Sequence, residues 1–120
     1  MLIDTFKFSD SVFGFIINSS IDSRNLGELE FKIDEVLNLP KKISIYIEEG
    51  EQGDVAYSTL IQHFKWKLKH KNSFDRIAFV SNNSVLKLLV KIETWFLIKA
   101  KTKTFDRKQR ATALSWVSLV

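Results

Sequence analysis

The chain has 120 residues with no cysteine and one proline, and 45% of its residues are hydrophobic, including ten Phe and three Trp. This composition suffices for one folded domain over residues 1–120, and it excludes a disulfide framework, thiolate chemistry and global disorder. The net charge of +4 is unevenly spread, because residues 1–60 hold five basic and eleven acidic side chains, whereas residues 61–120 hold thirteen and three. Either the basic half binds an acidic partner or a second copy of the chain, or the charges only coat solvated faces.

The sequence lacks the patterns of a secreted or membrane-spanning protein. Residues 1–18 contain two aspartates and no basic leader, unlike a secretory signal peptide. The longest apolar segment, 85–98, is interrupted by three charged residues and is too short to cross a bilayer. We therefore expect a cytoplasmic protein.

The first part of the chain predicts a β-hairpin followed by a helix. Strands at 5–8 and 12–18 are separated by a short polar turn. The helix begins at Asp22 or Ser23, either of which is a suitable N-cap. Its apolar residues recur at the spacing of one buried helix face: Leu26, Leu29, Ile33, Val36 and Leu37.

In the next strand, 42–49, isoleucine occupies every second position, with polar or aromatic residues between. Such alternation indicates a strand packed on one face only, since a strand covered on both faces is apolar throughout. We therefore expect Ile43, Ile45 and Ile47 beneath helices, and Ser44, Tyr46 and Glu48 facing outward or into a partner.

The remaining elements alternate between helix and strand, which predicts an α/β domain with a mainly parallel sheet. Right-handed crossovers between strands in sequential order place the helices on one face of that sheet. In the final helix Ala113 and Trp116 are three residues apart, and Trp116 is the expected core anchor. The predicted elements are helix 54–70, strand 76–81, helix 84–96, strand 99–105 and helix 107–119.

Four short stretches in the second half of the chain form a recognisable series: residues 65–70, residues 74–80, Phe105 with Asp106, and Ala113 with Trp116. In this order they resemble the SpoIIAA-like family, which is related in fold to STAS domains and to the SEC14 or CRAL-TRIO fold. The resemblance extends over nearly the whole chain. It implies four turns of a β/α superhelix, with a mainly parallel five-stranded sheet, one antiparallel N-terminal strand and helices mostly on one face.

The resemblance also bears on function. STAS switch proteins carry a phosphorylatable serine at the start of the helix that follows the central strand. Here the corresponding turn, 48–54, has no hydroxyl group, and the first ones are Ser58 and Thr59 within the predicted helix. We expect a non-catalytic regulatory or scaffolding domain that binds a protein partner or forms a homodimer, with no cofactor. The alternative is a carrier of a lipid or small apolar ligand.

Acidic residues gather where the predicted central strand ends, at the sheet edge where open α/β folds bind ligands. They suit a cation site or a general base, but helix capping and dipole preferences also place acids before a helix. His63 and His70 lie two turns apart on the next helix, too far apart to share a metal without further ligands. Solvated surface histidines explain them better. The acidic residues are Glu48, Glu49, Glu51 and Asp54.

Alternating lysines in the last predicted strand have two interpretations. Lysines protect a sheet edge from aggregation, and they also hold an anionic partner. We expect Lys99, Lys101 and Lys103, with Tyr46, to contact a protein partner. Nucleic acid is a less suitable partner, because lysines outnumber arginines here and Trp66 is the lone interleaved aromatic residue.

Two apolar features complete the list of candidates. Trp66 lies off the apolar stripe of its helix, and it either packs against a neighbouring helix or forms an exposed interface anchor. The helix that begins near residue 84 offers a wide apolar surface, which is the expected site of an apolar ligand. Its residues are Leu86, Leu89, Val90, Trp95 and Phe96.

Overall fold

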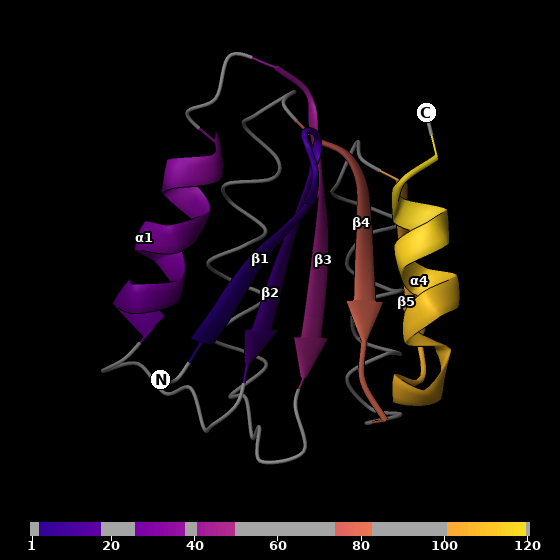
Figure 1. The fold of residues 1–120 in the computed structure, drawn as a ribbon. Helices are drawn as coiled ribbons and strands as arrows, with labels where there is room; N and C mark the ends of the chain where they lie inside the picture. Colours follow the sequence, from indigo (N-terminus) through magenta and orange to yellow (C-terminus); the bar gives the residue numbers. More distant parts are fainter. Residues whose placement is uncertain (1–2, 18–25, 38–40, 50–73, 83–100, 120) are drawn as a thin grey trace.

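Five strands form one sheet whose strand order follows the chain, and a helix lies on each face of it (Figure 1). The structure is a computed structural model, and it describes residues 3–17, 26–37, 41–49, 74–82 and 101–119. The described elements are β1 (Ile3–Ser9), β2 (Val12–Ile17), α1 (Leu26–Leu37), β3 (Ile43–Glu49), β4 (Phe74–Val80), β5 (Lys101–Phe105), the 3-10 turn η1 (Arg107–Gln109) and α4 (Arg110–Val117).

The strand directions confirm the predicted topology. β1 pairs antiparallel with β2 through a tight turn, while β2, β3, β4 and β5 pair in parallel. The hairpin register shifts between Lys7 and Ser9, and an ion pair joins the Lys7 ammonium to the Asp10 carboxylate across 3.3 Å beside the turn. The result is the five-stranded, mainly parallel sheet with one antiparallel N-terminal strand that the sequence predicts.

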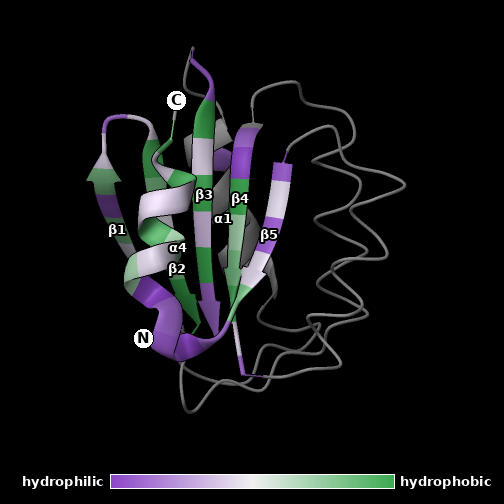
Figure 2. Cartoon of the chain, turned by 90° about the vertical axis from the view of Figure 1, so that its right-hand side faces the viewer, coloured by the Kyte–Doolittle hydropathy of each residue, from purple (hydrophilic) through white to green (hydrophobic). Residues whose placement is uncertain are grey.

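The two described helices lie on opposite faces of the sheet, as Figures 1 and 2 show from perpendicular directions. α1 connects β2 to β3 and lies on one face. α4 follows the last strand and packs on the other face, over β3, β4 and β5. The two faces of the sheet are therefore covered by segments from different ends of the chain.

Burial in β3 corrects one expectation from the sequence. Ile43, Ile45 and Ile47 are buried as predicted, but so are the residues between them. Tyr46 is only 2% exposed, and Ser44 and Glu48 are almost as inaccessible. The prediction that these three face outward is wrong, because α4 covers their side of the strand.

Small residues on α4 allow its close contact with the sheet. Ala113 and Val117, one helical turn apart, are fully buried and pack with Val12, Tyr46, Ala78, Val80 and Phe105. Trp116 is only half-buried and packs at the margin of this cluster. Ala113 therefore contributes to the core as predicted, whereas Trp116 forms its edge and Val117 takes the central position.

An aromatic pair, Phe6 and Tyr46, extends the core on this face from α4 toward β1. Phe6 on β1 stands directly opposite Gly14 on β2, and a Cβ atom on Gly14 would overlap the Phe6 ring. The ring then meets Tyr46 edge-on, with ring centroids 5.7 Å apart. Gly14 is thus the residue that lets Phe6 lie flat on the sheet and extend the core toward β1.

Element boundaries differ from the predictions by a few residues. β4 begins two residues earlier than expected, and the predicted last helix divides into η1 and α4, while the first two residues of the predicted strand 99–105 lie outside the described residues. The Gln109 side chain accepts a hydrogen bond of 3.0 Å from the Asp106 backbone N–H, which caps this turn. The predicted helices 54–70 and 84–96 lie outside the described residues.

Candidate functional site

Several polar groups interact with one another at the carboxyl ends of the parallel strands. Glu48, at the end of β3, is buried, and its Oε1 lies 3.0 Å from the Arg110 Nε. The same oxygen accepts a hydrogen bond of 2.5 Å from the Tyr46 hydroxyl. An ion pair therefore joins the first residue of α4 to the central strand. Its carboxylate, on the strand, is buried, and its guanidinium, on the helix, is half exposed.

Tyr46 titrates abnormally because of this position. Burial raises the pKa of its phenol well above the ordinary value, and the hydrogen bond to Glu48 and the negative charge of that carboxylate raise it further. The Arg110 and Arg107 cations oppose the shift without reversing it. Tyr46 is thus a neutral hydrogen-bond donor throughout the physiological pH range, not a proton-transfer group.

Further hydrogen bonds at this edge join strand ends to one another. The Ser81 hydroxyl donates to Glu49 Oε1 across 3.2 Å, and the Ser81 backbone N–H donates to the Phe105 carbonyl. The Asn82 side-chain oxygen accepts from the Arg107 backbone N–H. Like the Glu48 pair, these contacts fix β3, β4, β5 and η1 together, so the edge where ligands bind in many α/β folds is held here by intramolecular bonds.

Several predicted candidates cannot be placed on this edge. Glu51 and Asp54 of the acidic cluster lie outside the described residues, as do His63, His70 and Trp66. Within residues 3–17, 26–37, 41–49, 74–82 and 101–119, no group of three or more His, Cys, Asp or Glu side chains is suited to hold a metal ion. The predicted apolar-ligand residues Leu86, Leu89, Val90, Trp95 and Phe96 also lie outside them.

A second polar region lies near the amino ends of β4 and β5, and we call it the basic surface: Arg76, Lys101, Lys103 and Trp116. Lys101 and Lys103 are exposed, and by the alternation of β5 they share a face with Phe105, the face that carries α4. Arg76 pairs directly with Lys101 in the sheet register. In Figure 2 the starts of β4 and β5 are correspondingly hydrophilic and lie side by side.

Two of these cations, those of Arg76 and Lys103, lie over aromatic rings. The Arg76 guanidinium lies over the Trp116 ring, 5.0 Å from its centroid, and donates a hydrogen bond to the Trp116 carbonyl oxygen. The Lys103 ammonium lies 5.4 Å from the centroid of Phe105, which in turn packs against Trp116. Of the four residues predicted to contact a partner, Lys101 and Lys103 are accessible, Tyr46 is buried beneath α4 and Lys99 is outside the described residues.

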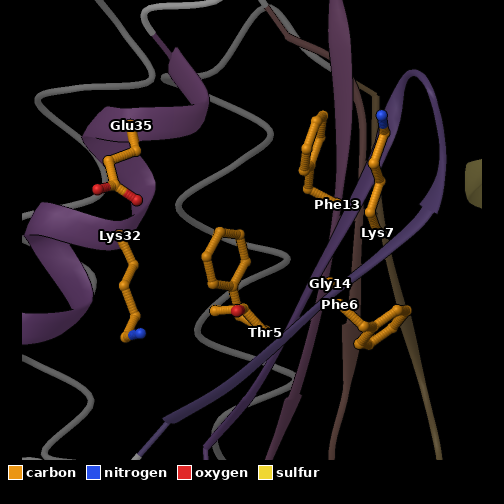
Figure 3. Close-up of a pocket in the computed structure, with 8 residues that line it drawn as sticks. Thr5, Phe6, Lys7, Phe13, Gly14, Lys32 and Glu35 are labelled. Atoms are coloured by element: carbon orange, nitrogen blue, oxygen red, sulfur yellow. The ribbon is translucent and has the colours of Figure 1, made fainter.

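A cavity of about 390 Å³ separates α1 from β1 and β2. Phe13 and Phe15 line it on the sheet side, and Lys32 and the exposed Glu35 line it on the α1 side (Figure 3). Thr5, Phe6, Lys7 and Gly14 complete the lining. The cavity has a size that accepts a small organic ligand, with apolar walls on one side and charges on the other.

Comparison with known proteins agrees with the fold described above. The model of the family described as SpoIIAA-like matches residues 12–118, which is most of the chain. The chain belongs to the SpoIIAA-like family. A search of curated proteins finds no significant match.

A solved structure supports the SpoIIAA-like fold independently. It is the crystal structure of an uncharacterized protein of the DUF3478 family with a SpoIIAA-like fold, from Shewanella loihica PV-4. The two share 18% sequence identity and superpose with a TM-score of 0.68, over 96% of this chain and 91% of that one. At this identity the likeness establishes the fold.

Sequence patterns missed one residue of the basic surface, Arg76, and one of the carboxyl edge, Arg110. A lone arginine has no periodic pattern to mark it, although Arg76 lies within one of the SpoIIAA-like stretches and Arg110 lies between two others. The polar residues of β3 were a usable signal for Glu48, since a charge in a central strand requires a partner.

No helix among the described residues is long and apolar enough to cross a membrane.

Proposed function

We propose that this chain is a non-catalytic regulatory or scaffolding domain that binds an acidic protein partner in the cytoplasm through the basic surface. The observation that carries the proposal is the set of cations around Trp116. Arg76, Lys101 and Lys103 form no ion pair with any carboxylate in the described residues. Cations held beside aromatic rings, with a half-buried tryptophan among them, are typical of protein interfaces.

The carboxyl edge supports binding over catalysis. A carboxylate such as Glu48 can act as a general base, and an arginine such as Arg110 can bind an anion. Here Glu48 forms an ion pair with Arg110 and accepts a hydrogen bond from Tyr46. A general base needs access to a substrate proton, and Glu48 is buried beneath α4. Glu48 and Arg110 therefore stabilise the fold, whereas the lysines of the basic surface remain accessible to a partner.

Site-specific photo-crosslinking in the native host tests the proposal. A photoreactive amino acid at position 103 is expected to form a covalent adduct with a protein that mass spectrometry identifies. The adduct should disappear when Lys101→Glu is added. Position 108 serves as the matched control, because Lys108 is also exposed but lies at the opposite end of β5, beyond its carboxyl terminus. Equal adducts at both positions, or adducts with nucleic acid alone, would contradict the proposal.

A second candidate function is the binding of a small apolar or amphipathic ligand, favoured by the cavity beneath α1. Phe13 and Phe15 supply aromatic contact surface, and Lys32 stands opposite them. Native mass spectrometry of gently purified protein tests this candidate. A retained small molecule that is lost on Phe15→Ala but kept on Phe31→Ala would support it, since Phe31 is an exposed ring on the same helix as Lys32 and does not line the cavity. Protein free of any small molecule would count against it.

A further inference from the structure

α1 carries an exposed aromatic residue. Phe31 is 65% exposed, which is unusual for so large an apolar side chain. At 100° per residue, Glu28, Phe31 and Glu35 fall within about 60° of one another around the helix, because their spacing is i, i+3 and i+7. We call these three residues the acidic surface. It combines one aromatic ring with a carboxylate on either side.

The basic surface offers the opposite combination. Arg76 and Lys101 carry like charges on directly paired positions of adjacent strands, an arrangement that destabilises a sheet unless an anion lies nearby. The Arg76 Nε is buried and has no hydrogen-bond partner among the described residues. Trp116 lies beneath the Arg76 guanidinium and is half-buried. An incoming carboxylate would relieve the repulsion, and an aromatic ring would cover the tryptophan.

The two surfaces cannot meet within one molecule. The acidic surface belongs to α1, which covers the face of the sheet near β1 and β2. The basic surface lies on the opposite face, at β4 and β5 (Figures 1 and 2). Complementary charges on opposite sides of one chain can only be paired between molecules.

We infer that this chain self-associates head to tail, with the acidic surface of one copy seated on the basic surface of the next. The inference rests on the proposed function and names a second copy as the partner. A contact between two different surfaces is heterologous, so repetition yields a ring or an open chain of molecules and not a closed two-fold dimer. Phe31 packs beside Trp116, while Glu28 and Glu35 face Arg76, Lys101 and Lys103.

Such a contact is small and depends on charge. Seven residues bury less area than a stable dimer requires, so the association is weak, with dissociation constants in the range of roughly 10 µM to 1 mM. Because the charges are exposed, raising the salt concentration from about 0.05 M to 0.5 M shortens the screening length severalfold and should dissociate the assembly.

Sedimentation equilibrium of the full chain tests the inference with two charge-reversed variants. Lys101→Glu/Lys103→Glu removes the basic surface, and Glu28→Lys/Glu35→Lys removes the acidic one. Each variant alone is expected to associate at least about tenfold more weakly than the parent. Mixed together, the two variants should associate again, because the intact acidic surface of the first meets the intact basic surface of the second and the two reversed surfaces are also opposite in charge. The matched control, Lys7→Glu/Lys108→Glu, makes the same charge change at exposed lysines elsewhere and should associate like the parent.

Circular dichroism spectra and melting curves of the variants establish that each remains folded, and the mixing experiment recovers binding from two inactive proteins, which misfolding cannot explain. A parent that stays monomeric at millimolar concentration and low salt would overturn the inference, as would association that ignores both pairs of reversals. These outcomes are separate from the proposed function, because crosslinking at position 103 to a different protein would support that function while self-association fails.

Discussion

The Arg110 Nε lies 3.0 Å from the Glu48 Oε1, and this contact joins the first residue of α4 to the end of the central strand β3. The Glu48 end is buried, with 5% of its side chain exposed, whereas half of the Arg110 side chain remains accessible. The Tyr46 hydroxyl donates to the same carboxylate oxygen. One buried carboxylate therefore sets where the last helix begins on the sheet.

Removal of Arg110 should destabilise the fold. Arg110→Ala leaves the buried Glu48 side chain without its ion-pair partner, and we expect the free energy of unfolding to fall by about 2 kcal/mol. This is less than the 3–5 kcal/mol typical of a fully buried pair, because Arg110 is half exposed. Urea denaturation measures the change. The double variant Glu48→Gln/Arg110→Ala should be more stable than the sum of the single effects predicts, and strict additivity would show that the two residues are not coupled.

Tyr46 gives the protein a specific alkaline sensitivity. The phenol has a raised pKa when folded and an ordinary pKa of about 10 when unfolded, so above pH 10 the unfolded chain releases a proton that the folded chain keeps. The stability contributed by Tyr46 is complete below pH 10 and falls as pH rises toward the folded pKa, by about 1.4 kcal/mol per pH unit. Tyr46→Phe should lose this slope relative to the parent in urea denaturation between pH 9 and 11. Parallel pH profiles would contradict the assignment.

The Phe6–Gly14 contact predicts an unusual response to a small substitution. Gly14→Ala places a Cβ inside the Phe6 ring, so the ring must leave Tyr46, and we expect a loss of about 1–3 kcal/mol in unfolding free energy. In a Phe6→Ala background the same change should be neutral or slightly stabilising, because the clash is gone and alanine suits a strand better than glycine. Thermal melts of the four proteins test this, and an equal cost in both backgrounds would disprove the clash.

Trp116 should matter less to stability than its size suggests. The ring is half-buried between Phe105 and Arg76, outside the fully buried contact of Ala113 and Val117. We expect Trp116→Ala to cost about 2 kcal/mol, below the 3–5 kcal/mol of a fully buried tryptophan. Chemical denaturation gives the value. A loss of 4 kcal/mol or more would restore Trp116 to the role of core anchor that the sequence predicted.

The order of strands and the hairpin were predictable from local patterns, but the cover of β3 was not. Alternation of isoleucine with Ser44, Tyr46 and Glu48 normally marks a solvated face. Here the polar atoms of that face find partners inside the molecule: the Ser44 hydroxyl accepts from the Arg76 N–H, and Glu48 binds Tyr46 and Arg110. Periodicity indicates which residues share a face of a strand. It does not indicate which distant residues will form hydrogen bonds or ion pairs with their polar groups.

The basic and acidic surfaces were likewise predictable only in part from the sequence. The exposure of Lys101 and Lys103 follows from their alternation along one strand, so the sequence located part of the basic surface. Arg76 joins it only through the register of β4 against β5, and Trp116 only through the docking of α4. Phe31 belongs to a helix whose other apolar residues fall on one stripe, so its position off that stripe was readable in advance as an unexplained apolar residue.

The position of α4 at the end of the chain affects folding during synthesis as well as the stability of the folded protein. During synthesis the strands emerge from the ribosome before residues 110–117, which alone supply Ala113 and Val117 to the face that bears Tyr46, Ala78 and Val80. Until that helix is translated, the apolar residues that α4 covers among the described strands lack this contact on the nascent chain, which makes them prone to aggregation and to capture by chaperones. A premature stop before residue 110 would therefore yield a protein that retains every strand yet is insoluble.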